Sequence, residues 1–294
     1  MDLTEFAADV GDASAGPVTI AGSASRAGGV AGFRAVAAPC GIEWIQADEM
    51  TVLCGAATLV RDLDSALVAV GQCVALPPSG TVGGALAVGH SGVRRLGYGP
   101  VRDTLLQVRY VSADGEVVKA GGPTVKNVSG FDLCRLLVGS RGTLGFIGEV
   151  ILRTRPLPAM SQWFSTTNDP WSTFAALYRP VSVLWDGVTT WVLLEGHAQD
   201  VREQAALASL REVEGPPTLP TEARWSVPPS QLRALTSTSG FVAEIGVGVV
   251  HHTQPAPSRA TSPAVIALHR RLKQQFDPSG RLNPGVGPLV PTAT

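Results

Sequence analysis

The stretch of sequence from Pro77 to Ile147 constrains the fold most, because three glycine-dense turns alternate there with strand-like and helix-like segments. It begins with PPSGTVGGALAVGHSG, continues through YGPVRD and ends with GGPTVKNVSGFDLCRLLVGSRGTLGFI. Glycine lets the backbone approach a ligand closely, and converging backbone N–H groups are good donors for phosphate oxygens. The pattern therefore indicates a site for a phosphorylated cofactor.

Two short turns are the best candidates for holding a pyrophosphate. The first follows the apolar segment from Val18 to Ala21, and the second follows Pro78. Each combines small residues with hydroxyl groups, which add donors to those of the backbone. The candidate positions are Gly22, Ser23, Ala24, Ser25 and Arg26 in the first turn, and Pro78, Thr81, Val82, Gly83 and Gly84 in and before the second. Taken singly, each turn is equally well explained as an ordinary tight turn.

The second turn also predicts the start of a helix. Gly83 and Gly84 would open it, and Gly89 would end it after Val88. Unpaired N–H groups in the first turn of a helix attract anions, and the field there contributes about 0.3–1 kcal/mol to binding. We therefore expect this helix start to face the phosphates.

The spacing of Gly139, Gly142 and Gly145 superficially matches a dinucleotide-binding fingerprint. In that fingerprint a strand comes first, then the glycines, then a helix. Here a short helix, expected over 131–138, precedes the glycines, and a strand, expected over 146–154, follows them. The order disfavours a Rossmann site for NAD.

The remaining periodicity predicts an α+β chain. Thr58 is the expected cap of a helix whose apolar stripe ends at Val70, and a hairpin is expected around Asp114-Gly115. Further strands are expected over 181–185, 191–194 and 241–250, and further helices over 201–213 and from Pro263 to Phe276. The last helix has an apolar stripe that we expect to be buried, made of Val265, Leu268, Leu272 and Phe276.

Composition and proline-rich boundaries suggest how the chain is divided. Its 294 residues, 45% of them hydrophobic, can bury the core of one large or two modest domains. The residue composition and the pattern of predicted elements change near Pro156 and Pro158, and again at the linker from Pro255 to Ser258. We expect three parts, with residues 1–157, 158–260 and 261–294.

Charge and cysteine usage exclude several classes of function. A net charge of −1 with scattered arginines argues against a nucleic-acid partner. No apolar run approaches the roughly 20 residues needed to span a bilayer, and the acidic start from Met1 to Ala15 does not look like a signal peptide, so a cytoplasmic protein is expected. The isolated cysteines form no metal motif, so an iron–sulfur cluster would have to belong to another chain.

Several motifs together resemble a known family. They are GPTVKNVSGFDL from Gly122, LVGSRGTLG from Leu137, YGPVRD from Tyr98, FDPSGRLNPG from Phe276, and PP ahead of TVGG. The chain resembles the FAD-binding oxidases of the vanillyl-alcohol oxidase type and, among them, the GlcE-type subunits of bacterial glycolate oxidase. The resemblance covers nearly the whole sequence. It implies a PCMH-type fold, in which two α+β subdomains within 1–157 hold FAD, a small α+β cap at 158–260 carries the substrate side, and 261–294 returns to the FAD domain.

The resemblance also implies roles for single residues. The loop from Gly22 to Arg26 and the turn of Thr81, Gly83 and Gly84 would bind pyrophosphate, Ser91 and Gly92 would lie near the flavin ring, Gly142 and Ile147 would meet the adenosine part or the ring, and Lys126 and Asn283 would face the ring region. A cation at Lys126 would stabilise negative charge that develops on the reduced flavin. Since the first loop has no histidine and the residues directly before Thr81 include no cysteine, the FAD is expected to be non-covalent.

The implied function is that of an FAD-binding subunit in a glycolate-oxidase-like 2-hydroxy-acid dehydrogenase complex. Its partners would be a GlcD-like catalytic flavoprotein and a GlcF-like iron–sulfur subunit, with at most peripheral membrane association through them. Two alternatives stay open at this point. The chain could be a self-sufficient FAD-dependent 2-hydroxy-acid dehydrogenase, or a structural subunit with little flavin.

Residues for substrate turnover are much less distinct in the sequence. Oxidation of a 2-hydroxy acid needs a base for the hydroxyl proton and a cation for the carboxylate. His251 and His252 are candidates, but neighbours on a strand point to opposite faces and cannot chelate one metal together. Arg224, beside Trp225, is a candidate carboxylate clamp. Surface histidines and an arginine packed along a strand explain the pattern equally well, so no metal site is predicted and the catalytic residues stay unassigned.

Overall fold

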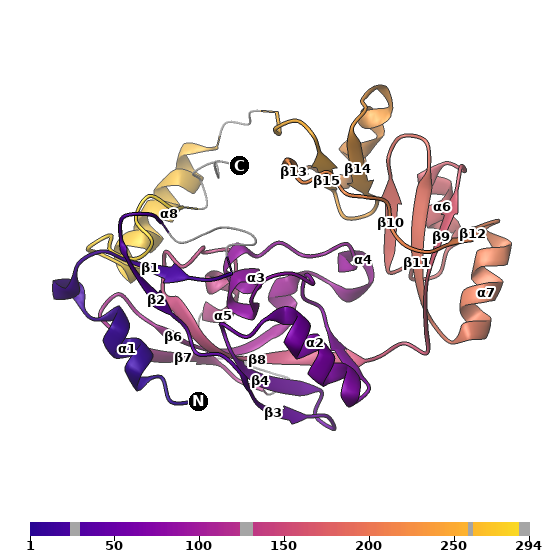
Figure 1. Cartoon of the computed structure of the whole chain (residues 1–294). Helices are drawn as coiled ribbons and strands as arrows, with labels where there is room; N and C mark the ends of the chain where they lie inside the picture. The colour runs from indigo at the N-terminus through magenta and orange to yellow at the C-terminus, as the bar shows by residue number, and fades with distance from the viewer. Residues whose placement is uncertain (24–29, 124–131, 258–260, 288–294) are drawn as a thin grey trace. The chain divides into compact units, whose positions relative to one another are not determined.

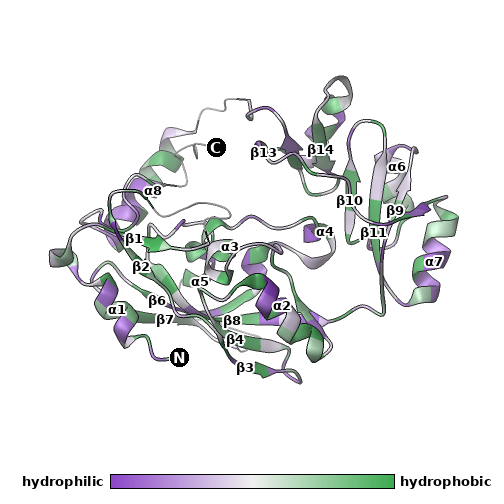
Figure 2. Cartoon of the chain, viewed as in Figure 1, coloured by the Kyte–Doolittle hydropathy of each residue, from purple (hydrophilic) through white to green (hydrophobic). Residues whose placement is uncertain are grey.

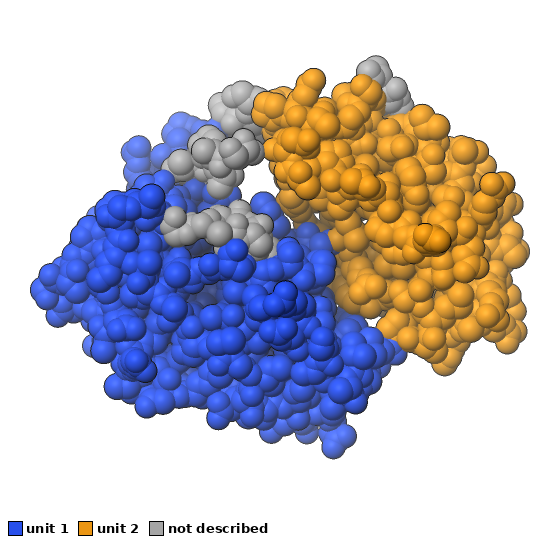
Figure 3. All heavy atoms as spheres, viewed as in Figure 1, with its two compact units in different colours: residues 1–92, 100–157, 260–292 blue, residues 93–99, 158–259, 293–294 orange. Residues whose placement is uncertain are grey.

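The computed structural model describes residues 1–23, 30–123, 132–257 and 261–287. The chain forms two compact units, which Figures 1 and 3 show. Unit 1 comprises Met1–Gly92, Pro100–Leu157 and Ala260–Thr292, and unit 2 comprises Val93–Gly99, Pro158–Arg259 and Ala293–Thr294. Each unit has helices, a sheet and a hydrophobic core of its own, which confirms the α+β class. Within the described ranges, no helix has the length and apolar character needed to cross a membrane.

A six-stranded antiparallel sheet is the frame of unit 1. Its strands are β3 (Ile42–Gln46), β4 (Thr51–Gly55), β5 (Gln72–Val74), β6 (Leu105–Val111), β7 (Val117–Gly121) and β8 (Phe146–Pro156). They run in the order β3-β4-β8-β6-β7, and β5 pairs with the far end of β8. β6 and β7 form the predicted hairpin, and β8 is fully buried from Phe146 to Leu152. Figure 2 shows hydrophobic residues along this sheet and on the nearby strand β1.

Several short helices belong to the same unit. They are α1 (Thr4–Val10), η1 (Ala13–Ala15), α2 (Val60–Ala69), α3 (Val82–Val88), η2 (Val101–Asp103) and α5 (Leu133–Leu137). Of the predicted stripe of α2, Val60, Leu63 and Leu67 pack in the core, whereas Val70 is 45% exposed. The predicted cap is wrong. Leu59 occupies the N-cap position, because the Thr58 hydroxyl is already used by Gly41, donating to its carbonyl oxygen at 3.0 Å and accepting from its N–H at 2.9 Å.

A parallel two-stranded ribbon and the tail of the chain pack together at one end of unit 1. β1 (Val18–Ala21) pairs with β2 (Arg34–Ala37), and Leu282 bridges to Val18 on the other side of β1. The tail is anchored by Arg281, which is buried and donates hydrogen bonds to the carbonyl oxygens of Val10, Gly11, Gly16 and Ala113. The first and the last segments of unit 1 therefore form one layer.

Helix α8 (Pro263–Phe276) begins at the predicted proline. The predicted burial of its apolar stripe is wrong, since Val265 is 41% exposed, Leu268 is 52% exposed and no residue of α8 is buried. The helix is fixed mainly near its C-terminal end, where the Lys273 ammonium donates to the carbonyl oxygen of Thr143 at 2.8 Å. A periodic stripe predicts a helix well, but burial needs a partner surface along its whole length.

Unit 2 is built on a seven-stranded antiparallel sheet. Its strands, in spatial order, are β12 (Arg211–Val213), β9 (Met160–Thr166), β11 (Thr190–Gly196), β10 (Ser182–Trp185), β14 (Phe241–Glu244), β15 (Val249–His252) and β13 (Ala223–Ser226). The helices of the unit are α4 (Arg95–Tyr98), α6 (Pro170–Ala176), α7 (Ala198–Leu207) and η3 (Pro229–Ser237). The core lies between the sheet and helices α6 and α7 and includes Trp185, Phe241 and Leu232.

Two sequence predictions in unit 2 need correction. The segment 241–250 is a hairpin of β14 and β15 rather than one strand, because Gly246 and Gly248 take positive φ angles of 79° and 84° and reverse the chain. The helix predicted over 201–213 ends at Leu207, and the last three residues of the predicted range, Arg211–Val213, form strand β12. The hairpin brings ionisable side chains of β14 and β15 next to each other.

Candidate functional site

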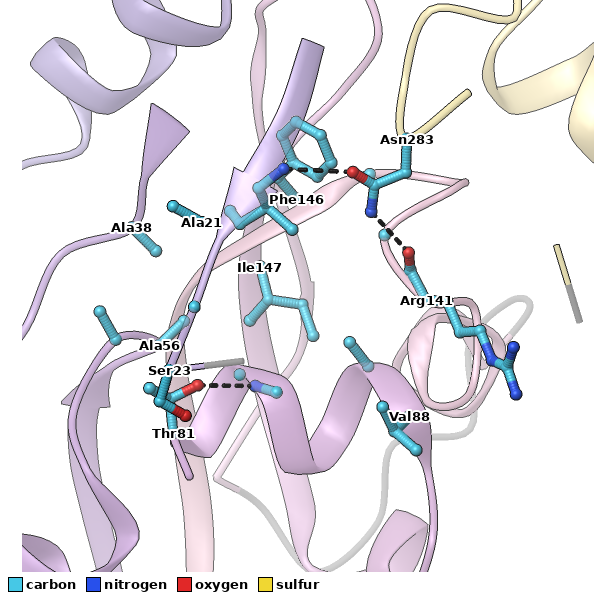
Figure 4. A pocket seen from close by; sticks show the side chains of 18 of the residues that line it. Ala21, Ser23, Ala38, Ala56, Thr81, Val88, Arg141, Phe146, Ile147 and Asn283 are labelled. Atoms are coloured by element: carbon cyan, nitrogen blue, oxygen red, sulfur yellow. Dashed lines mark hydrogen bonds between the residues drawn. The ribbon is translucent and has the colours of Figure 1, made fainter. Parts of the chain in front are cut away.

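A cavity in unit 1 collects segments that are far apart in the sequence, as Figure 4 shows. The end of β1, the loop after β4, helix α3, the turn before β8 and the tail all contribute to its wall. The empty space within it, including space open to solvent, is about 870 Å³. The predicted residues on the wall are Gly22, Ser23, Thr81, Gly83, Gly84, Gly142, Ile147 and Asn283.

Other predicted residues lie elsewhere. The side chain of Val82 is fully buried in the core, and the hydroxyl of Ser91 accepts a hydrogen bond from the N–H of Val101 at 3.0 Å. Pro78 and Gly92 also lie off the cavity wall, although Gly92 approaches Pro77. The predicted positions Ala24, Ser25, Arg26 and Lys126 fall outside the described residues.

The start of α3 is arranged differently from the expectation. The helix forms over Val82–Val88 as predicted, with Thr81 as its cap and Gly89 after its end. However, the N–H of Gly84 donates to the Thr81 hydroxyl at 3.1 Å, and the N–H groups of Val82 and Gly83 donate to carbonyl oxygens in segment 56–58 at 2.9 and 2.8 Å. These N–H groups are therefore not free to bind an anion, and only the helix field and the Thr81 hydroxyl can act on a ligand.

The glycines of the wall have different physical roles. A Cβ added to Gly83 would lie 2.8 Å from the Cβ of Ala56, and one added to Gly142, whose φ is +70°, would lie 2.6 Å from the Asn283 amide nitrogen. These two glycines are required by packing. A Cβ added to Gly22 would meet no described atom within 4 Å, so this glycine borders open space.

Asn283 joins three parts of the cavity wall. Its Oδ1 accepts from the Thr19 hydroxyl at 2.8 Å and from the Ile20 N–H at 3.1 Å, and its Nδ2 donates to the Arg141 carbonyl at 2.7 Å. Two of these three bonds are drawn in Figure 4. The side chain is 6% exposed. Its amide is therefore engaged in holding β1, the tail and the turn before β8 together, and we call these three bonds the Asn283 bracket.

Small apolar side chains make up most of the wall, and the sequence analysis missed them. They are Ala21, Ala38, Ala56, Ala57 and Ala87, together with Ile20, Val88, Phe146 and Val286. The polar contributions come from Ser23, Thr81, Arg141 and Asn283, with the backbone of Gly22 and Gly145 alongside. Shallow alanine walls leave room for a flat ring system, while a hydroxyl and the glycine loop can meet phosphate oxygens. The run Gly55-Ala56-Ala57 directly after a buried strand was the signal that could have indicated this wall.

The candidate catalytic residues of unit 2 lie on opposite faces of its sheet, as strand alternation predicts. His252 is 1% exposed and stacks on Trp225 at 4.1 Å between ring centroids, on the core side. We therefore assign His252 to packing. His251 lies on the other face, where its Nε2 is 2.9 Å from Oε1 of Glu244, and Arg224 lies beside it on the neighbouring strand. The described residues contain no cluster of His, Cys, Asp or Glu side chains that could hold a metal ion.

Two family patterns match the sequence. Residues 12–121 match the FAD binding domain, and residues 242–286 match the C-terminal domain of FAD linked oxidases. The chain belongs to the FAD-linked oxidases. FAD is accordingly the cofactor, as the sequence predicted, and the PCMH-type fold is confirmed by the first match and by the solved structures below.

Similar proteins differ in how much of them the chain covers. It is 28% identical over 285 residues to the glycolate oxidase subunit GlcE of Escherichia coli, covering 81% of both chains. It is 40% identical over 117 residues to a D-lactate dehydrogenase of Archaeoglobus fulgidus, but that match covers 38% of this chain and only 26% of the other. Among solved structures, alkyldihydroxyacetonephosphate synthase shares the fold with a TM-score of 0.66 at 15% identity, covering 96% of this chain and 72% of that one.

Proposed function

We propose that the chain is the FAD-binding subunit of a glycolate-oxidase-like complex that oxidises a small 2-hydroxy acid. The observation that carries this proposal is the likeness to GlcE along most of both chains. Bound FAD supplies an acceptor for two electrons. In this proposal a GlcD-like catalytic flavoprotein and a GlcF-like iron–sulfur subunit complete the electron path in the cytoplasm. A likeness to the Bacillus subtilis glycolate oxidase subunit GlcD, 42% identical over 78 residues, accords with a shared flavin domain.

The cavity of unit 1 is the proposed FAD site. Its alanine-rich walls, with Ile147 and Phe146, would take the ring systems, and Thr81 with the loop that begins at Gly22 would take the phosphates. The predicted role of Lys126 near the flavin ring remains part of this proposal. We further propose that residues 1–157 are the FAD-binding domain, that 158–260 are a substrate-side cap, and that 261–294 complete the FAD domain.

Replacement of Gly22 by valine tests the cofactor site with little risk to the fold. A Cβ added there meets no described atom within 4 Å, and the φ of Gly22 is not in the left-handed region, so the melting temperature of the flavin-free chain should change little. The valine side chain would occupy cofactor space, and flavin content should fall roughly tenfold or more. Gly215→Val is the matched control, because Gly215 in unit 2 has equally open surroundings. If Gly22→Val retains full flavin, the cofactor lies elsewhere.

The subunit role is tested by producing the chain alone and with its partners. We expect a yellow protein that does not reduce its flavin with glycolate when alone, and turnover once GlcD-like and GlcF-like chains are added. Bleaching of the flavin by glycolate or D-lactate in the isolated chain would support a self-sufficient dehydrogenase instead. A colourless chain that still assembles with the partners would support a structural subunit.

A further inference from the structure

The sheet of unit 2 has one face that its helices α6 and α7 do not cover, and ionisable side chains gather there. Strand alternation puts Arg224 of β13, His251 of β15 and Glu244 of β14 on this face. Arg224 is directly opposite His251, and His251 is opposite Val242, two residues before Glu244. Three adjacent strands thus bring a guanidinium, an imidazole and a carboxylate together.

Glu244 is the most unusual member of this group. Its side chain is 3% exposed, and its Oε1 lies 2.9 Å from the Nε2 of His251. This distance allows a hydrogen bond in which the Nε2–H of His251 donates to the carboxylate oxygen. The second oxygen, Oε2, is buried and has no hydrogen-bond partner among the described residues. A buried carboxylate oxygen without a donor is destabilising, so a donor from a ligand would be favourable.

Two arginines carry the positive charge in this part of unit 2. Arg224 and Arg95 are half-buried, and neither guanidinium group makes a hydrogen bond or a salt bridge with a described residue. Burial lowers the pKa of Arg224, an effect that the charge of Glu244 opposes and that of Arg95 increases. Arg95 belongs to α4, which is tied to this sheet by a hydrogen bond from the Gly97 N–H to the Val181 carbonyl at 3.1 Å. The charges of Glu244 and Arg95 both act on Arg224, and two positive charges with one negative charge leave this group able to accept an anion.

We infer that Arg224, Arg95 and Glu244 form a binding site for a small 2-hydroxy carboxylate and prefer it to the corresponding 2-oxo acid. This inference rests on the proposed function and names the residues that select its substrate. The carboxylate of the ligand pairs with Arg224 and Arg95, and the hydroxyl on the adjacent carbon donates to Oε2 of Glu244. His251 is a positioning residue that orients Glu244. A 2-oxo acid presents an acceptor to the same oxygen and is repelled.

Binding of D-lactate, pyruvate and propionate to the flavin-loaded full chain tests this selection. The three acids have the same carbon skeleton and differ only in the group on carbon 2. Calorimetric titration should show D-lactate bound about tenfold or more tightly than pyruvate, with propionate in between. Arg224→Met should weaken the binding of all three acids by about tenfold or more. Arg202→Met, the same change at an exposed position on α7, should have no effect.

Glu244→Gln separates selection from general anion binding. The amide keeps an acceptor for His251 and turns an NH₂ donor toward the position of Oε2, so the preference for D-lactate over pyruvate should vanish or reverse. Arg224→Lys, which keeps the charge, guards against loss of folding in Arg224→Met. Equal binding of D-lactate and pyruvate by the unaltered chain, or an unchanged preference in Glu244→Gln, would overturn the inference.

The flavin absorbance of the same samples distinguishes the two proposals. A yellow chain that binds none of the three acids would refute this site, indicating an internal arrangement of Arg224 with Glu244, while leaving the cofactor proposal intact. A colourless chain that still selects D-lactate would refute the cofactor site and support the acid site.

Discussion

Removal of the Asn283 bracket should open the cavity of unit 1 and destabilise it measurably. The Asn283 side chain makes three hydrogen bonds, with Thr19, Ile20 and Arg141. These bonds are shielded from solvent, since Asn283 is only 6% exposed. At about 0.5–1.5 kcal/mol each, their loss in Asn283→Gly should cost about 3 kcal/mol. Asn283 has a φ of +43°, so Asn283→Ala should cost about 1 kcal/mol more than the glycine variant.

Urea unfolding of both variants measures these costs, and hydrogen exchange at the Ile20 amide reports the bracket directly. The exchange rate at Ile20 should rise, and flavin should dissociate more readily, because two walls of the cavity lose their connection. Asn168→Ala, at an exposed position in unit 2, is the control and should change stability by less than about 0.5 kcal/mol. A cost below that limit in Asn283→Gly, with unchanged exchange at Ile20, would refute the reasoning.

Two further predictions concern ionisable groups. Asp277 is buried, which raises its pKa, but hydrogen bonds from Lys273 and the Leu282 N–H lower it more, so the folded pKa lies below the usual 3.8. Its stabilisation should be complete at pH values well above 3.8 and be lost as the pH falls below 3.8, and urea titrations should show the deficit of Asp277→Asn shrinking at acidic pH and not at neutral pH. Burial raises the pKa of Cys54 to about 12, whereas Cys40 is exposed, so iodoacetamide at pH 8 should alkylate Cys40 and spare Cys54 until urea is added, as read by peptide mass spectrometry. Rapid labelling of Cys54 in the folded chain would contradict its burial.

Local rules predicted most elements of this fold. The alternation around the turn Asp114-Gly115 predicted the hairpin of β6 and β7, and the proline at position 263 predicted the start of α8. The errors occurred where tertiary contacts compete with local preference. Thr58 is used by Gly41 rather than by its own helix, and Leu268 has a helical spacing but is 52% exposed. Neither fact can be read from neighbours in the sequence.

The site was predicted less completely than the fold. Glycine-rich loops identified the turns at Gly22 and Thr81, but the alanine walls carry no motif of their own. The group of Glu244, His251 and Arg224 depends on the register of three strands, and a single predicted strand over 241–250 hid the turn that brings Glu244 beside His251. The residue types indicated acid–base and anion-binding chemistry, but only the strand pairing showed that these three side chains share one face of the sheet.

The pairing of the tail with β1 has a consequence for how the protein is made. Thr19 and Asn283, which bond at the cavity wall, are 264 positions apart in the sequence. During synthesis, the segments of unit 2 are made after the amino-terminal part of unit 1 and before Asn283, the residue that closes the cavity wall. If the cavity holds FAD as proposed, the cofactor binds late in the synthesis of the chain, and a prematurely terminated product should lack the closed wall and be colourless.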